Sequence, residues 1–153
     1  MFCCLSSFGC GKSGDSTPVK PGGTPVNPIP LAKKRPASIG IVGDSSNVVK
    51  NTTGGMVLMG GGTDVEAAFK WMIERSGGGD VVIIRATGTD AYNPFVNGLG
   101  TVNSVETLLI NSKELANNDS VAYIIRNAEM VFIAGGDQSN YMNYWRGTKV
   151  EKA

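Results

Sequence analysis

The stretch MVLMGGGTDVEAAFKWMIERSGGGDVVIIRATGTD, residues 56–90, alternates short apolar runs with an amphipathic segment. Residues 56–59 predict a short strand, and the capping pattern of Thr63 and Glu66 predicts the start of a helix. Apolar residues then recur at helical spacing, and residues 81–84 predict the next strand. This order of strand, helix and strand predicts a βαβ unit of an α/β domain.

The rest of the chain continues this alternation and extends the predicted domain over residues 37–153. Successive strands joined by helices favour a doubly wound, mostly parallel sheet with helices on both faces. The expected strands cover 38–42, 105–110 and 130–134, and the expected helices cover 91–100 with an interruption near Pro94, 119–127 capped by Asn118, and 139–146.

Charge and residue usage exclude several classes of function. The 153 residues include 14 basic and 13 acidic ones, so no nucleic-acid partner and no attraction to an anionic membrane surface are expected. Histidine is absent, which excludes a Ser-His or Cys-His dyad within these residues and removes the commonest zinc ligand. We expect no metal site and no cofactor. No apolar run approaches the ~20 residues that a membrane-spanning helix needs.

Residues 1–36 form a separate segment rich in Gly, Pro, Ser and Thr, which is typical of a flexible tether. The three cysteines, Cys3, Cys4 and Cys10, all lie near its start, so a disulfide framework for the domain is not expected. The stretch before Cys10 resembles the end of a bacterial lipoprotein signal and makes Cys10 a candidate for lipidation. However, Ser7 stands where such signals prefer Leu, and no basic residue precedes the apolar stretch. A secreted or lipid-anchored protein is therefore expected, and a cytoplasmic protein whose tail has no function is the alternative.

In open parallel sheets, ligands bind beyond the carboxyl ends of the strands, and three loops of this chain are predicted to lie there. Residues 60–64 begin with three glycines before a helix and so resemble a phosphate cradle. They lack the Gly-Lys-Ser/Thr of a P-loop, so a tight turn is favoured over a nucleotide site. Asp64 in this loop and Asp90 in the loop over 85–90 are better explained as turn or capping residues than as substrate ligands.

The third loop, Gly135-Gly136-Asp137-Gln138, is more specific. Two glycines allow a sharp turn with successive amides pointing outward, and such amides can stabilise an oxyanion in acyl transfer. Gly136 and Asp137 are therefore candidates for oxyanion binding through their backbone amides. Gln138 is a candidate for substrate binding through its side chain, which both donates and accepts hydrogen bonds. From these residues alone, a purely structural turn explains the pattern equally well.

Four motifs occur in the order seen in one known family: Gly60-Gly61-Gly62-Thr63-Asp64, Ser76-Gly77-Gly78-Gly79-Asp80, Arg85-Ala86-Thr87-Gly88-Thr89-Asp90 and Phe132-Ile133-Ala134-Gly135-Gly136-Asp137-Gln138. Over roughly residues 37–153 the chain resembles cyanophycinase-like serine peptidases, which belong with dipeptidase E. The resemblance implies a three-layer α/β domain related to class I glutamine amidotransferases. It also implies a serine nucleophile in a Gly-Thr-Ser-Ala-Gly type motif, with a histidine and an acidic residue further on. The implied substrates are aspartyl peptides such as cyanophycin, a polyaspartate with arginine side chains.

The chain departs from this family at the catalytic residues. It contains neither a Gly-Thr-Ser-Ala-Gly motif nor a histidine, so none of its own residues is expected to be catalytic. Thr148 and Glu151 predict a helix that begins at Lys149. In the family the serine follows the last motif after one more helix and strand, so we expect the nucleophile to lie beyond Ala153.

The expected protein is therefore the N-terminal part of such a peptidase, with the oxyanion and substrate-binding half of the site. We expect this part to be inactive by itself. The alternative is a non-catalytic surface lipoprotein that binds peptide or carbohydrate on the same fold.

Overall fold

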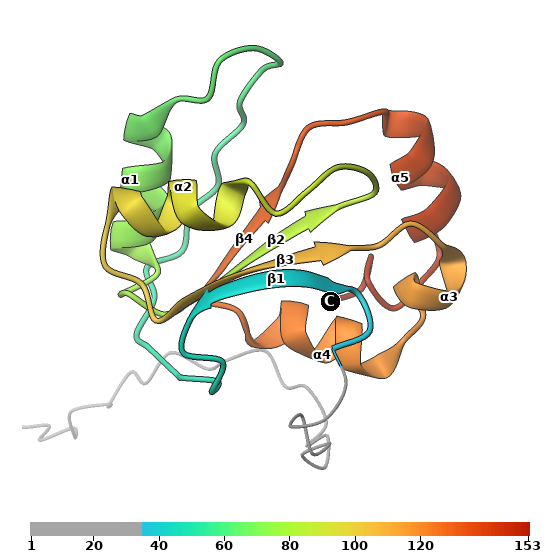
Figure 1. Cartoon of the computed structure of the whole chain (residues 1–153), viewed down its shortest axis with the longest axis horizontal. Helices are drawn as coiled ribbons and strands as arrows, with labels where there is room; N and C mark the ends of the chain where they lie inside the picture. Colours follow the sequence, from blue (N-terminus) through green and yellow to red (C-terminus); the bar gives the residue numbers. More distant parts are fainter. Residues whose placement is uncertain (1–34) are drawn as a thin grey trace, which may run out of the picture.

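The computed structural model describes residues 35–153, which form an α/β domain (Figure 1). Nearly all of the predicted tether, including Cys10, lies outside the described residues. Within residues 35–153, every helix is too short or too polar to span a bilayer. In chain order the elements are β1 (Ser38–Gly43), α1 (Glu66–Arg75), β2 (Asp80–Arg85), α2 (Tyr92–Leu99), β3 (Ser104–Leu109), α3 (Lys113–Ala116), α4 (Asp119–Asn127), β4 (Met130–Ile133) and α5 (Gln138–Trp145).

The described strands form a four-stranded sheet in the order β1-β3-β2-β4. The interior strand β2 runs parallel to β3 on one side and parallel to β4 on the other. At one edge, β1 runs antiparallel to β3. The β-branched run of β2 is buried on both faces, which is typical of a central parallel strand. The prediction of a mostly parallel sheet is therefore confirmed, and β1 makes it a mixed one.

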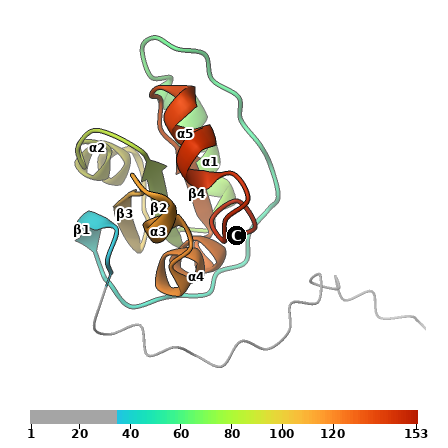
Figure 2. The ribbon, with the colours of Figure 1, turned by 90° about the vertical axis from the view of Figure 1, so that its right-hand side faces the viewer.

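Helices cover both faces of the sheet, so the domain has three layers (Figure 2). On one face, Phe69 of α1 and Val96 of α2 are buried in a core with Ile83 of β2. On the other face, the core of Ile84 includes Val121 of α4 and residues of α3 and α5. The two cores share β2, because successive side chains of a strand point to opposite faces. The α/β class is confirmed, whereas the finer relation to class I glutamine amidotransferases stays a prediction.

Residues 56–59 do not form the predicted strand and instead belong to the long connection between β1 and α1. Met56 and Leu58 are 81% and 87% exposed, and the segment pairs with none of the described strands. A short apolar run becomes a strand only through pairing with a neighbour, since cross-strand contacts supply most of its stability. The βαβ units of the fold are therefore built around β2, β3 and β4.

The predicted capping box of Thr63 and Glu66 is not formed. Helix α1 begins after Val65, whose side chain makes no capping hydrogen bond. Glu66 instead pairs with Lys70 one turn further on, at 3.2 Å on the exposed side of the helix. A threonine can cap a helix only where it directly precedes the first helical residue, and α1 begins at Glu66, three residues after Thr63.

Local chemistry explains how the helices α2, α3 and α4 begin. Asn118 caps α4 as predicted, because its Oδ1 accepts the amide of Ser120 at 2.9 Å. Pro94 does not interrupt α2, because it lies in the first turn, where helical amides lack a partner in any case. The short helix α3 was not predicted, and its cap is Ser112, which accepts the amide of Leu115.

The predicted helix from Lys149 is absent, and residues 146–152 form successive turns. The Thr148 hydroxyl donates backward to the carbonyl of Trp145 at 2.5 Å, and within the described residues it accepts no amide of a following turn. The prediction of a new helix at this point is therefore wrong, and the Thr148 side chain is directed back to the end of helix α5.

The last residues close two turns. Glu151 reaches back and accepts the amide of Gly147 at 2.6 Å, whereas a capping box would use the amide of Thr148. The amide of Ala153 donates to the carbonyl of Val150 at 3.2 Å, which forms a single turn where the sequence predicts a continuing helix. The capping box of Thr148 and Glu151 is thus not formed. The serine nucleophile expected beyond Ala153 lies outside the described residues and stays a prediction.

Candidate functional site

The loops after β2 and β4 leave neighbouring parallel strands towards opposite faces of the sheet. The loop after β2 leads to α2 on one face, and the loop after β4 leads to α5 on the other. The amide of Ala134 donates to the carbonyl of Ile84 at 3.1 Å, which holds the starts of the two loops side by side. This is the topological switch point of the sheet, the position at which open α/β domains commonly bind ligands. We call it the switch-point site.

The turn over 135–138 lies exposed at this point, and it presents unused donors. Asp137 is the cap of α5, since its Oδ1 accepts the amide of Ser139 at 2.8 Å. Within residues 35–153, the amides of Gly136 and Asp137 and the side chain of Gln138 make no hydrogen bond. The predicted oxyanion and substrate-binding groups are therefore brought together with their donors unoccupied.

Gly136 is required by close packing rather than by its backbone conformation, because its φ is not positive. A Cβ at this position would lie 2.6 Å from Oη of Tyr141, whereas a Cβ at Gly135 would meet nothing within 4 Å. Tyr141 is itself held in place, with its hydroxyl donating to the Ala134 carbonyl at 2.6 Å and its ring 4.5 Å from that of Trp145. The turn is therefore fixed against α5 through Gly136 and Tyr141.

Arg85 belongs to the switch-point site although the sequence motif around it did not single it out. It is the last residue of β2, half-buried, and directly follows Ile84, which pairs with Ile133 of β4. Its Nε donates to the carbonyl of Thr87 at 2.5 Å, and its Nη1 donates to that of Thr89 at 2.6 Å. Within the described part of the chain, Arg85 makes no ion pair with a carboxylate. A half-buried positive charge thus stands beside the turn without a compensating anion.

Two tyrosines flank this guanidinium. Burial raises the pKa of Tyr141, while the positive charge of Arg85 acts in the opposite direction. Burial also raises the pKa of Tyr92, and the hydrogen bond from its hydroxyl to the Asp64 carboxylate adds to this effect. The guanidinium lies 6.0 Å from the centre of the Tyr92 ring. Both phenols therefore keep their protons and serve as hydrogen-bond donors near Arg85.

The two aspartates of the neighbouring loops have structural roles. Both carboxylate oxygens of Asp64 lie 3.0 Å from the hydroxyl of Tyr92, which ties the loop before α1 to α2. The carbonyl of Asp90 accepts the amide of Asn93 at 2.8 Å and so forms the turn into α2. The interpretation as a turn residue fits Asp90, whereas Asp64 uses its carboxylate for a contact with a residue 28 positions away.

The glycine loop over 60–62 lacks the setting of a phosphate cradle. None of the described strands leads directly into it, and the helix after it begins only at Glu66. A Cβ at any of these glycines would meet nothing within 4 Å, so the loop does not wrap closely around other described residues. Cradles of this kind depend on a strand that delivers the glycines to a helix N-terminus. The nucleotide-binding alternative therefore has no support from the arrangement of this loop.

The donors of the switch-point site are suited to an anion such as a carboxylate or an oxyanion, because hydrogen bonds between ionised partners are the strong ones. Within the described residues, no group of three His, Cys, Asp or Glu side chains is placed to hold a metal ion. Comparison of the chain with models of known protein families finds no match, and comparison with curated proteins finds none either.

Proposed function

We propose that this chain supplies the oxyanion and substrate-binding half of a serine-type peptidase of cyanophycinase type that acts on aspartyl peptides. The observation that carries the proposal is that the turn over 135–138, with unoccupied donors, and Arg85, half-buried and without an ion pair among the described residues, follow the paired strands β4 and β2 at the switch point. The resemblance of the motifs, above all the one over 132–138, supports the same function.

Each donor has a distinct task in this proposal. The amides of Gly136 and Asp137 stabilise the negative oxygen that forms when a nucleophile attacks the peptide carbonyl. Gln138 holds the peptide group through its side-chain amide. Arg85 takes a substrate carboxylate, because its remaining N–H donors match the two oxygens of that group.

The acylation step itself requires groups that this chain does not contain. A serine hydroxyl becomes a nucleophile when a neighbouring base accepts its proton, and these 153 residues include no histidine. The chain by itself therefore binds aspartyl peptides and does not hydrolyse them.

A binding titration tests the proposal. The ligands are an aspartyl dipeptide and the same dipeptide with its carboxylates converted to amides. We expect saturable binding of the acidic peptide and at least about tenfold weaker binding of the neutral one, since a charge-assisted hydrogen bond contributes about 1.5–3 kcal/mol. Equal binding of the two peptides, or none, would overturn the proposal.

Variants assign the effect to the switch-point site. Arg85→Met should weaken binding of the acidic peptide at least about tenfold, while Arg126→Met, at an exposed site on α4, serves as the matched control. Gln138→Ala should weaken binding without changing stability beyond about 0.5 kcal/mol, because its side chain is exposed. If neither Arg85→Met nor Gln138→Ala changes the affinity, the peptide binds elsewhere.

A non-catalytic peptide-binding protein is the second candidate. It is favoured by the fact that binding groups are present while the chain has no histidine to act as a base. The two functions are separated by assaying the product of the complete reading frame on aspartyl peptides. Turnover supports the peptidase, and binding without turnover supports the binder.

A further inference from the structure

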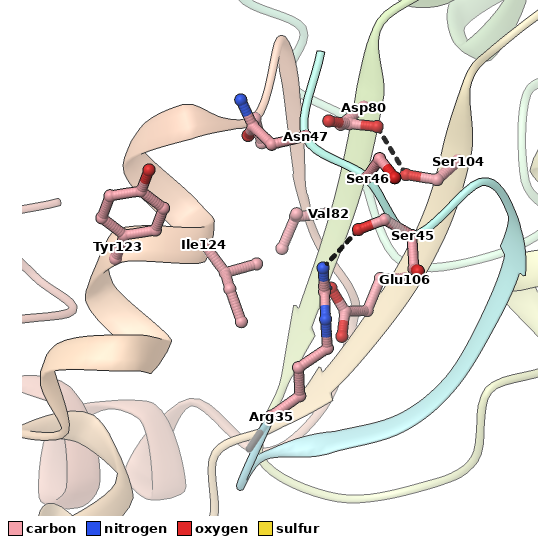
Figure 3. Close-up of a pocket in the computed structure, with 11 residues that line it drawn as sticks. Arg35, Ser45, Ser46, Asn47, Asp80, Val82, Ser104, Glu106, Tyr123 and Ile124 are labelled. Atoms are coloured by element: carbon pink, nitrogen blue, oxygen red, sulfur yellow. Dashed lines mark hydrogen bonds and ion pairs between the residues drawn. The ribbon is translucent and has the colours of Figure 1, made fainter. Parts of the chain in front are cut away.

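A cavity of about 430 Å³ lies at the amino-terminal ends of β2 and β3, at the opposite end of the sheet from the switch-point site. It is bounded by these strands, by α4 and by the loop after β1, and its volume lies in the range of small-molecule sites. Figure 3 shows Arg35 and Glu106 on one side of it and Tyr123 and Ile124 of α4 on the other. The proposed peptidase function does not use this cavity.

Glu106, in the middle of β3, is only 2% exposed and lines the cavity. Its Oε2 accepts a hydrogen bond from the guanidinium of Arg35. Its Oε1 is buried and accepts no hydrogen bond from any residue of the described part of the chain. A buried carboxylate oxygen without a donor is unfavourable, because it has lost its hydrogen bonds to water. The cavity therefore contains an acceptor that a bound donor can satisfy.

The second carboxylate of the cavity is already satisfied. Oδ1 of Asp80 accepts from the side chain of Asn103 at 2.8 Å and from the hydroxyl of Ser104 at 2.6 Å. Its Oδ2 accepts the amide of Val48 at 3.0 Å. Asp80 thus anchors the loop after β1 to the ends of two strands. Glu106, by contrast, keeps one oxygen available for a ligand.

The charges that line the cavity do not balance. Among the described residues that line it, one guanidinium, that of Arg35, faces the two carboxylates of Asp80 and Glu106, which leaves one negative charge without a described partner. Arg35 also donates to the carbonyl of Ser45 at 2.8 Å, so it is held in place between the loop and the sheet. A ligand with one positive charge would balance the cavity, because a partly buried charge needs a partner.

Part of the wall is apolar, with Val82 from β2 and Ile124 and Ala128 from α4 and its end, while serines, Asn47 and Tyr123 line the rest. We propose that the cavity binds a small organic compound with a primary ammonium group on a short aliphatic chain. The ammonium donates to Oε1 of Glu106, and the aliphatic chain packs against Val82 and Ile124. A neutral hydroxyl would satisfy the hydrogen bond but would leave the charge unbalanced.

Amide NMR spectra of the isotope-labelled full chain test this proposal, with butylammonium as the probe and butanol as its neutral counterpart. Sodium chloride at the same concentration controls for ionic strength. We expect saturable shifts at Glu106 and Ser104 with butylammonium, and at least about tenfold weaker binding of butanol. Absence of saturable shifts at these residues means that the cavity holds only water, and equal binding of the two probes removes the charge argument. Either result overturns the proposal.

Glu106→Gln removes the charge and keeps the shape, and it should weaken butylammonium binding at least about tenfold. Glu114→Gln, at an exposed position of α3, is the matched control and should leave binding unchanged. Ala128→Leu fills the cavity without altering a charge, so it should block binding even if Glu106→Gln does not fold. Undiminished binding to folded Glu106→Gln or to Ala128→Leu contradicts the proposal. Aspartyl peptide binding at the switch point is measured separately and is expected to be unaffected.

Discussion

Replacing Gly136 by alanine tests whether the turn over 135–138 is held by close packing against α5. The added Cβ would lie 2.6 Å from Oη of Tyr141 and 3.3 Å from its Cζ. The first distance is too short for any carbon–oxygen contact, so either the turn or the tyrosine must move. The φ of Gly136 is not positive, so the alanine introduces no strain of its own backbone.

The cost follows from what Tyr141 loses when it moves. Its hydrogen bond to the Ala134 carbonyl contributes about 0.5–1.5 kcal/mol, and its contact with the Trp145 ring a similar amount. We therefore expect Gly136→Ala to lower the free energy of unfolding by about 1–3 kcal/mol. Gly135→Ala is the matched control. It enters open space and should raise the free energy of unfolding by about 0.4–1 kcal/mol, because alanine restricts the unfolded chain.

A double-mutant cycle with Tyr141→Phe isolates the contact. Without the hydroxyl, the nearest ring atom lies 3.3 Å from the new Cβ, so Gly136→Ala should cost less in this background than in the parent. The measurement is urea denaturation of the parent, both single variants and the double variant. The reasoning is refuted if Gly136→Ala is as stable as Gly135→Ala, or if its cost is the same in both backgrounds.

Two further predictions concern the tyrosine near Arg85 and the free edge of the sheet. Burial raises the pKa of Tyr92 above its ordinary value of 10.0, so the folded chain holds this proton more tightly than the unfolded chain does. Stability from this group is fully present below about pH 10 and is lost as the pH rises further, and Tyr92→Phe should show a shallower loss in denaturation measured across that range. Equal slopes for the two proteins would count against the assignment. Val131 and Ile133 of the edge strand β4 are 40% and 58% exposed, so the chain should self-associate through this edge. Ile133→Lys should reduce light scattering at equal concentration, and unchanged scattering would point to another surface.

Several elements of the fold could be predicted because their signals are local. The β-branched run of β2 is apolar enough to be buried on both faces, which only an interior strand permits. Asn118 precedes an amphipathic helix and caps it with its own side chain. The strands 38–42, 105–110 and 130–134 were predicted to within about two residues, as short apolar runs between polar loops usually allow.

The errors arose where the outcome depends on partners distant in sequence or on a competing contact. Residues 56–59 have the composition of a strand, but a strand exists only where a neighbour pairs with it, and no described strand does. Thr148 has the position of a helix cap, yet its hydroxyl points back and donates to the carbonyl of Trp145, and the chain from there to Ala153 forms turns. In both cases the local pattern is present, and residues outside the pattern determined the structure.

The candidate site likewise contains residues that could be predicted from the sequence and residues whose position depends on the fold. The turn residues Gly136, Asp137 and Gln138 could be predicted from the sequence, because two glycines before two polar residues are typical of a sharp turn. The position of Arg85 beside them follows from the parallel pairing of β2 with β4, strands separated by α2, β3, α3 and α4 in the chain. The unsatisfied oxygen of Glu106 depends likewise on Arg35, which lies 71 residues away. Residue types set which groups can bind a ligand, and the pairing of distant strands sets which of them meet and which are left without a partner.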